Sequence, residues 1–426
     1  MDDAHDPARA APASPGEADG GPPPRPSGAP GAARSDSDSE AECGGAGHAE
    51  PGGRSRNRRR RNRGAARQDG EARRRLYAAV DLGTNNCRLL IARPADRDGG
   101  FEVVDAFSRI VRLGEGLAQT GALSEAAMAR TIAALRICAS KMRRRNVARA
   151  RIVATEACRM ASNADVFMQR VARETGLDLD VVTAEDEARL AVLGCAPLLD
   201  REAARALVFD IGGGSTELVW LDMTPGGRGS EPQLLAWASL PVGVVTLADR
   251  YGGRSLDAAG YAAMVAEVEG RLAGPLWPQG LADAMADSIG QGNVQLLGTS
   301  GTVTTIAGIH LDLPRYDRAQ VDGTWIDFAE VTGVTRRLGA MTFDQRAEVP
   351  CIGRERADLV MAGCAILEAI QKAWPCRRLR VADRGLREGI LVTMMREDRR
   401  RQRRRRNGRA ASSAAHPHRK DAPDGA

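Results

Sequence analysis

The sequence predicts an α/β protein with mixed sheets, whose ordered middle consists of two related halves. Apolar strand patterns alternate with helical patterns along residues 76–397, which is typical of α/β domains. In addition, one local pattern occurs twice. An apolar strand, an Asp-aliphatic-Gly turn and a return strand appear around Asp81 and again around Asp210. A motif that is repeated once at the distance of a domain indicates an internal duplication.

The first half is expected to begin with a strand at residues 76–80, a Gly/Asn turn at 81–86 and a return strand at 87–92, which together are typical of a hairpin. Ser124 is a good N-cap and opens a long amphipathic helix. The remaining elements expected in this half are strands at 101–110, 152–155 and 179–183, and helices at 163–174 and 185–193.

The second half repeats the opening pattern, with a strand at residues 206–209, a glycine-rich turn at 210–216 and a return strand at 217–220. Further apolar runs predict strands at 235–240, 294–298 and 379–382. Amphipathic runs predict helices at 258–272 and 356–374, after residue 301, and after residue 389.

The two ends of the chain differ in composition from this middle. Residues 1–53 are rich in Pro, Gly, Ala and acids, whereas residues 54–75 and the chain beyond residue 397 are rich in Arg. Because neither end shows apolar periodicity, both are expected to be disordered. The expected organisation is a tail at 1–75, a first domain at 76–200, a second domain at 201–397 and a tail at 398–426.

The net charge of +6 is concentrated in these tails. Arginine-rich tails can simply be solvated, or they can hold a polyanion such as RNA, DNA or a phosphate polymer. Binding of the second kind is expected to weaken steeply with salt.

Histidine usage excludes several classes of enzyme. Of the five histidines, only His310 lies in the ordered middle, so a Ser-His-Asp triad, a Cys-His pair or a poly-His metal site would have to be built on that residue. Catalysis is therefore expected from carboxylates, backbone amides, hydroxyls and a metal. The sequence shows no secretory signal, membrane span or CxxC pair, so a cytoplasmic protein with reduced cysteines is expected.

The two Asp-led turns predict a phosphate site. Backbone N–H groups of a glycine-rich turn form a nest for anions, and glycine allows phosphate oxygens to approach closely. The predicted donors in these turns are Gly83, Thr84, Gly212, Gly213, Gly214, Ser215 and Thr216. Ser300, Gly301 and Thr302 open a helix, whose unpaired N–H groups form a further anion site.

Aspartates beside a phosphate repel it, and a divalent metal resolves that conflict. Mg²⁺ is typically held by one or two carboxylates together with phosphate oxygens. We therefore expect Asp81 and Asp210 to bind Mg²⁺. The alternative is that each aspartate only caps its own turn.

Glu185, Asp186 and Glu187 open a predicted helix, where acids also complement the helix dipole. A hydrolase nevertheless needs a group that deprotonates water, and in the absence of histidine a carboxylate is the remaining choice. Arginines beside turns can contact a polyphosphate bidentately. The candidates are Arg112, Arg159, Arg384 and Arg387.

Seven motifs resemble, in order, those of the Ppx/GppA phosphatases, the family of exopolyphosphatases and guanosine pentaphosphate phosphatases. They cover roughly residues 76–397 and lie at residues 79–85, 112–116, 154–159, 185–190, 210–217, 298–302 and 383–389. The resemblance implies the actin-like, ribonuclease H-like fold of acetate and sugar kinases, Hsp70 and actin, with two domains and a central cleft.

The resemblance also implies an activity. It is the Mg²⁺-dependent hydrolysis of terminal phosphoanhydride bonds of polyphosphate, of guanosine pentaphosphate in the stringent response, or of both, by a cytoplasmic homodimer. Glu187 matches the family's glutamate that activates water, and Asp210 and Glu217 match acids associated with metal and water. The first phosphate loop is matched by Asp81, Gly83, Thr84 and Asn85, and the family's arginine near the cleft by Arg159.

The sequence departs from the family pattern at several positions, and the departures at residues 84 and 86–88 bear on the preferred length of the substrate chain. Thr84 stands where Ser is common, Asn86, Cys87 and Arg88 stand where many members have Ser, an aromatic residue and His, and Asp186 replaces a Glu. The chain is also expected to lack the C-terminal helical domain of longer members, which argues against high processivity. Two alternative hypotheses are a small-molecule kinase on the same fold, and a non-catalytic polyphosphate or nucleotide sensor with RNA-binding tails.

Overall fold

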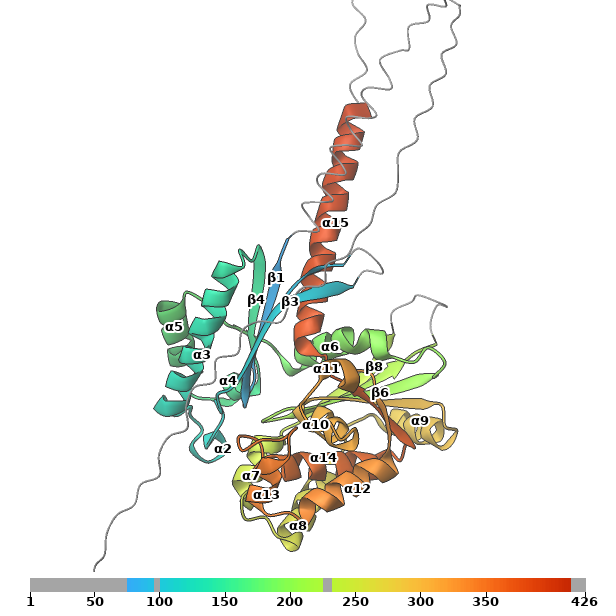
Figure 1. Cartoon of the computed structure of the whole chain (residues 1–426). Coiled ribbons are helices and arrows are strands. Elements are labelled where there is room, and N and C mark those ends of the chain that lie inside the picture. Colours follow the sequence, from blue (N-terminus) through green and yellow to red (C-terminus); the bar gives the residue numbers. More distant parts are fainter. Residues whose placement is uncertain (1–74, 96–99, 225–231, 415–426) are drawn as a thin grey trace, which may run out of the picture. The chain divides into compact units, whose positions relative to one another are not determined.

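A computed structural model of the chain describes residues 75–95, 100–224 and 232–414. These residues belong to one compact unit, Arg61–Ala426, whose strands form two sheets (Figure 1). The predicted tail at 1–75, apart from Arg75, lies outside the described residues, as do residues 415–426 of the second predicted tail.

The first sheet has the strand order β3-β2-β1-β4-β5. β1 pairs antiparallel with β2 and parallel with β4. The strands are β1 (Tyr77–Leu82), β2 (Asn86–Pro94), β3 (Phe101–Ile110), β4 (Arg149–Ala154) and β5 (Asp180–Val181).

The second sheet repeats this arrangement strand for strand. Its order is β10-β11-β9-β6-β7-β8, so β8-β7-β6-β9-β11 corresponds to β3-β2-β1-β4-β5, with the same antiparallel and parallel pairings. The repeat confirms the predicted duplication and the actin-like class that the family resemblance implies. The strands are β6 (Arg205–Ile211), β7 (Thr216–Asp222), β8 (Gln233–Leu240), β9 (Val294–Thr299), β10 (Trp325–Asp327) and β11 (Arg378–Ala382).

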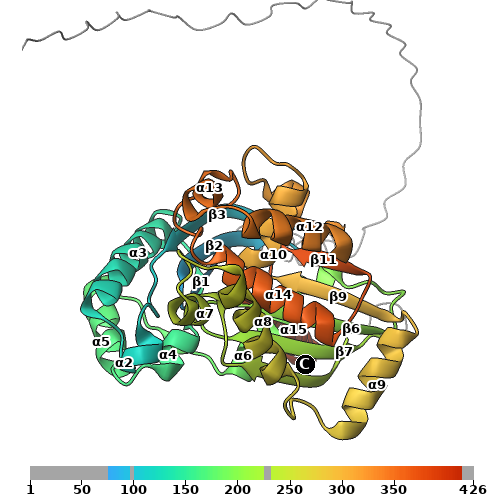
Figure 2. The same cartoon turned by 90° about the horizontal axis from the view of Figure 1, so that it is seen from below.

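Helices cover both faces of each sheet, because alternate residues of a buried strand point to opposite sides. Val80 and Leu82 of β1 pack with α3 (Glu125–Arg144) and α5 (Ala164–Thr175), whereas Tyr77 and Ala79 pack against α15 (Leu386–Ala414). In the second sheet, Leu207 and Phe209 of β6 pack with helices that include α8 (Ala258–Leu272) and α14 (Val360–Ala373). Figure 2 shows these two helices over the sheet.

Two helices, α6 (Ala184–Cys195) and α15, connect the halves. α15 packs on the first sheet, whereas α6 packs on the second through Ala188 and Cys195, and the two helices pack against each other. Their approach requires glycine, since a Cβ on Gly389 would lie 1.9 Å from the backbone oxygen of Leu190 and one on Gly194 would lie 2.0 Å from that of Gly385. The first turns of α6 and α15 both contribute residues to the cavity that is described in the next subsection.

Most predicted elements are present, and α8 and β3 have the predicted bounds. The predicted helix at 356–374 begins later, at Val360, and the strand at 179–183 is reduced to two residues. The sequence did not predict β10, nor the following helices: α2 (Leu117–Thr120), α4 (Glu156–Met160), η1 (Ala196–Leu198), α7 (Val244–Tyr251), α9 (Gln279–Gly290), α11 (Arg318–Val321), α12 (Phe328–Gly339) and α13 (Phe343–Glu348). The remaining predicted helix is α10 (Gly301–His310).

The C-terminal prediction needs a correction. α15 continues to Ala414, so residues 398–414 are helical and not disordered. Arg, Gln and Ala are good helix formers, and extending an existing helix costs far less than nucleating a new one. Among the helices that the structure describes, none is both long and apolar enough to cross a membrane.

Candidate active site

The first Asp-led turn is held in place by a segment that follows β3. The backbone oxygen of Asn85 accepts hydrogen bonds from Val111 N (2.9 Å) and Arg112 N (3.0 Å), and that of Thr84 accepts one from Gly114 N (2.9 Å). A Cβ on Gly114 would lie 2.3 Å from Cγ2 of Thr84, so a larger residue would push the turn away. The motif around Arg112 therefore supports the first turn from behind.

The second turn has the same tight form and touches the first. Gly212 N donates to the backbone oxygen of Ser215 (2.9 Å). A Cβ on Gly213 would lie 2.9 Å from Cβ of Thr84, and one on Gly214 would lie 2.9 Å from Oγ1 of Thr84. Only glycine allows the two turns to approach this closely, although they lie far apart in the sequence.

One cavity collects most of the predicted phosphate-binding residues. Its lining includes Gly83, Thr84, Asn85, Gly212, Gly213, Gly214, Ser215, Ser300, Gly301 and Thr302. Ser300 has a φ of 135° and its Oγ accepts hydrogen bonds from Thr302 N (3.2 Å) and Val303 N (3.4 Å), so its hydroxyl caps α10. Thr216 does not line the cavity, because its hydroxyl is buried and donates to the backbone oxygen of Val242 (2.7 Å).

Five carboxylates line the same cavity: Asp81, Glu156, Glu187, Asp210 and Glu217. Burial, and then the charge of Asp81, raise the pKa of Asp210 to about 6. Burial, and then the charge of Asp210, raise the pKa of Glu217 to about 7. Such mutually repelling acids in a cavity are typical of functional sites, where a cation or a proton is needed to neutralise them.

Glu187 lies in the first turn of α6, where Thr183 caps the helix by accepting a hydrogen bond from Asp186 N (3.1 Å). Burial raises its pKa well above the usual value, the charge of Glu217 raises it further, and Arg159 acts in the opposite direction. Glu187 therefore holds a proton more readily than an exposed glutamate does.

Glu217 is almost fully buried and is held by two hydroxyls. Oγ of Ser215 donates to its Oε1 at 2.6 Å, and Oγ of Ser239 donates to the same oxygen at 3.1 Å. Sequence reasoning did not identify Ser239, which lies on β8 directly opposite Glu217 on β7. Cross-strand pairing in the second sheet was the signal that could have found it.

Arg159 is predicted to contact phosphate, and in the structure its guanidinium contacts two carboxylates and a backbone carbonyl. Its guanidinium donates to Glu156 Oε2 (2.8 and 3.0 Å), to Glu187 Oε2 (2.7 Å) and to the backbone oxygen of Val182 (2.9 Å). Glu156 and Glu187 line the cavity and Arg159 does not. The arginine therefore holds two carboxylates from behind.

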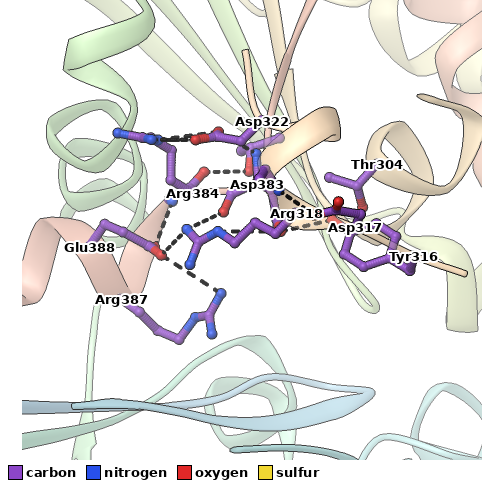
Figure 3. A network of polar contacts seen from close by, with 12 residues as sticks. Thr304, Tyr316, Asp317, Arg318, Asp322, Asp383, Arg384, Arg387 and Glu388 are labelled. Carbon is purple, nitrogen blue, oxygen red and sulfur yellow. Dashed lines mark hydrogen bonds and ion pairs between the residues drawn. The ribbon is translucent and has the colours of Figure 1, made fainter. Parts of the chain in front are cut away.

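Other predicted arginines also form internal contacts. Arg112 pairs with both oxygens of Asp358 (2.9 and 3.1 Å), and thereby joins the first half to the second. Arg384 pairs with Asp322 of the loop after α11 (Figure 3).

The motif at residues 383–389 forms the network that Figure 3 shows at the start of α15. Glu388 is 2% exposed and accepts hydrogen bonds from Arg318 (2.8 Å) and from Gly385 N (2.9 Å). Burial alone would raise the pKa of Glu388, but Arg387 and Arg318 lower it below the usual value. The network fixes the first turn of α15, whose Leu386 lines the cavity.

Sequence reasoning also did not assign Arg88 and Arg356 to the site, although both line the cavity. Arg88 lies opposite Asp81 in the β1–β2 pairing, and its side chain makes no hydrogen bond or ion pair with another described residue. Burial, followed by the charge of Arg387, lowers its pKa. The register of the predicted hairpin places residues 81 and 88 side by side, and this was the signal available in the sequence.

The sequence profile of the Ppx/GppA phosphatase family matches residues 90–398. Exopolyphosphatase 2 of Mycobacterium tuberculosis is 30% identical over 331 residues, which are 74% of this chain and 98% of that protein. The crystal structure of the Aquifex aeolicus member of the family is 29% identical, with a TM-score of 0.61 over 76% of this chain and 98% of that one. An exopolyphosphatase structure from Cytophaga hutchinsonii shares the fold at 23% identity, with a TM-score of 0.66 over 76% of this chain and 98% of that one.

Proposed function

This chain belongs to the Ppx/GppA phosphatase family, and we propose that it releases orthophosphate by hydrolysing the terminal phosphoanhydride bond of inorganic polyphosphate. Guanosine pentaphosphate presents the same terminal bond and is the second candidate substrate. One observation carries the proposal: two glycine turns, a helix N-terminus and five carboxylates line a single cavity. Neither the kinase nor the sensor hypothesis is favoured by these findings.

The turns provide the phosphate site. The N–H groups of Gly83 and Gly212 close their own turns, so the proposed donors are the N–H groups of Gly213 and Gly214 and the nearly fully buried hydroxyl of Thr84. In such a water-poor site, fixed donors stabilise charge that develops on the phosphoryl oxygens. In-line attack needs little covalent participation from the protein, so positioning and charge stabilisation account for most of the catalysis.

Glu187 is the proposed general base, which orients the attacking water and takes its proton. Its raised pKa suits this role, because a carboxylate with a higher pKa takes a proton from water more readily. Arg159 fixes its orientation through the 2.7 Å hydrogen bond. Glu217, held by Ser215 and Ser239, lies close enough to affect the pKa of Glu187 and is proposed as a second acid that orients water.

Phosphatases of this family generally use a divalent metal, and we propose Mg²⁺ for this chain. Asp81 and Asp210 both line the cavity. The pKa of Asp210 is raised mainly by burial, and repulsion from the charge of Asp81 raises it further. Among the described residues, no group of three or more His, Cys, Asp or Glu side chains could hold a metal. This fits Mg²⁺, which is often held by one or two carboxylates and completed by water and substrate. When bound, the ion would supply positive charge beside the phosphoryl group.

We also propose that residues 76–200 and 201–397 act as two domains on either side of this cavity. α15 is then an element of the second domain that packs on the sheet of the first. We further propose a cytoplasmic location and a homodimer, and light scattering at several protein concentrations tests the latter. The arginine-rich tails are proposed to bind a polyanion.

The experiment that tests the function measures phosphate release by the purified full chain with Mg²⁺. It compares long-chain polyphosphate, tripolyphosphate and guanosine pentaphosphate. Release from polyphosphate supports the proposal, and a preference for the guanosine compound would assign the chain as an alarmone phosphatase. Release from none of the three by folded protein would contradict the proposal.

A further inference from the structure

α15 consists of two parts that meet at Asp398. Up to that residue the helix is part of the fold, because Ile390, Leu391, Met394 and Met395 are buried against the first sheet. Asp398 is the last residue anchored to the first sheet. It accepts hydrogen bonds from the hydroxyl of Tyr77 (3.0 Å) and from Arg149 (3.1 Å).

Beyond Asp398 the helix is strongly cationic. Arg399 is followed by four exposed arginines, Arg400, Arg401, Arg403 and Arg404, and the next acid in the sequence is Asp421. None of these five side chains forms a hydrogen bond or an ion pair with another described residue. Like charges three or four positions apart destabilise a helix, so bound anions would stabilise this part of α15.

The arrangement favours a flexible phosphate polymer as the anion. At about 100° per residue, positions 399–404 place arginines around more than half of the helix circumference, whereas a flat membrane surface would engage only one side. Residues 399–426 contain no Phe, Tyr or Trp. Proteins that bind single-stranded nucleic acid typically stack bases on aromatic side chains, so this segment suits a polyanion without bases.

The cationic part of the helix is rigidly connected to the proposed active site. Leu386, the first residue of α15, lines the cavity. Arg400 and Arg404 lie 14 and 18 positions further along the same helix, about 21 and 27 Å at 1.5 Å per residue. A long phosphate polymer can therefore have its end in the cavity and a distal part on these arginines, which raises its effective concentration at the site.

We propose that residues 399–404 of α15 form a second binding site for the distal part of long-chain polyphosphate. This inference rests on the proposed function and adds a dependence on substrate length. A chain of three phosphates cannot reach both sites, whereas a chain of several hundred can.

The test replaces the four exposed arginines in the full chain by Arg400→Gln, Arg401→Gln, Arg403→Gln and Arg404→Gln. A matched control removes four exposed charges elsewhere, by Arg143→Gln and Arg144→Gln on α3 and Arg336→Gln and Arg337→Gln on α12. At low salt, KM for polyphosphate of several hundred units is expected to rise at least about tenfold in the α15 variant alone. KM for tripolyphosphate is expected to stay unchanged in all three proteins.

A second measurement follows equilibrium binding of the same long polyphosphate to proteins that also carry Glu187→Gln, over a range of salt concentrations. The slope of log affinity against log salt is expected to be shallower in the α15 variant, because fewer counterions are released. An unchanged KM and salt slope, an equal change in the matched control, or tighter binding of single-stranded RNA than of polyphosphate to the helix would each overturn the inference. Absence of phosphate release from long-chain polyphosphate, tripolyphosphate and guanosine pentaphosphate by the folded wild type would instead refute the proposed function.

Discussion

Nη1 of Arg159 donates a hydrogen bond of 2.7 Å to Oε2 of Glu187, and the same guanidinium donates to Glu156. Arg159 is in α4, directly after β4, and Glu187 is in the first turn of α6. The proposed base is thus held by two helices and not by a loop. This arrangement restricts the movement of the carboxylate, which favours catalysis because small displacements of a reacting group are costly.

Arg159→Gln is expected to lower kcat roughly 10- to 100-fold with little change in KM, because the substitution disturbs the position of Glu187 and not the substrate contacts. Arg159 lowers the pKa of Glu187, so the acid limb of the kcat profile is also expected to move to higher pH. Steady-state kinetics between pH 5 and 9 measure both effects. A large rise in KM with kcat unchanged would instead support direct contact between Arg159 and phosphate.

The buried carboxylates predict an unusual pH dependence of stability. Asp210 and Glu217 have folded-state pKa values of about 6 and about 7, above their usual values. The folded state therefore binds more protons than the unfolded state between about pH 4 and pH 7, and without metal the free energy of unfolding falls as the pH rises through that range. Asp210→Asn is expected to raise Tm at pH 8 by several degrees. A lower Tm at pH 8 would show that the charge of Asp210 is compensated in the free protein.

Mg²⁺ is expected to raise Tm of the wild type at pH 8 and to have a much smaller effect at pH 5, where protons occupy the same carboxylates. In Asp210→Asn the increase at pH 8 is expected to be largely lost, because one of the two proposed ligands is neutral. Thermal unfolding with and without Mg²⁺ measures this without reference to turnover. An equal Mg²⁺ effect in both proteins would place the metal elsewhere.

The contact between the two turns predicts a steric effect. Gly214→Ala would place a Cβ 2.9 Å from Oγ1 of Thr84 and 3.0 Å from Cγ of Glu156, so the turns must separate. We expect kcat/KM to fall at least about tenfold, since small displacements in a site of this kind are costly. Gly270→Ala on α8, where a Cβ would meet nothing within 4 Å, is the control and is expected to retain full activity.

Much of the fold could be predicted because it depends on local pattern. The paired strands around Asp81 and Asp210 are consecutive in the sequence, and their repetition indicated the duplication that the two sheets display. The cavity could also be anticipated, because each Asp-led turn combines glycines with hydroxyl side chains in a short segment.

Other features depend on residues that are distant in the sequence. The glycines at 213 and 214 are required by Thr84, and no local pattern reveals that approach. Arg159 was predicted to contact phosphate, but two carboxylates and a carbonyl surround its guanidinium in the fold. The helical course of residues 398–414 was missed because a run of arginines lacks the apolar periodicity on which helix prediction relies.

The most direct measurement of the central claim compares phosphate release from long-chain polyphosphate by the wild type and by Glu187→Gln, with Mg²⁺ at the pH optimum. The substitution keeps the shape of the side chain but removes its ability to accept a proton. The variant is expected to fold with an unchanged or higher Tm, and its kcat is expected to be lower by roughly 10²- to 10⁴-fold. Wild-type turnover by Glu187→Gln would contradict the assignment of Glu187 as the base that activates water.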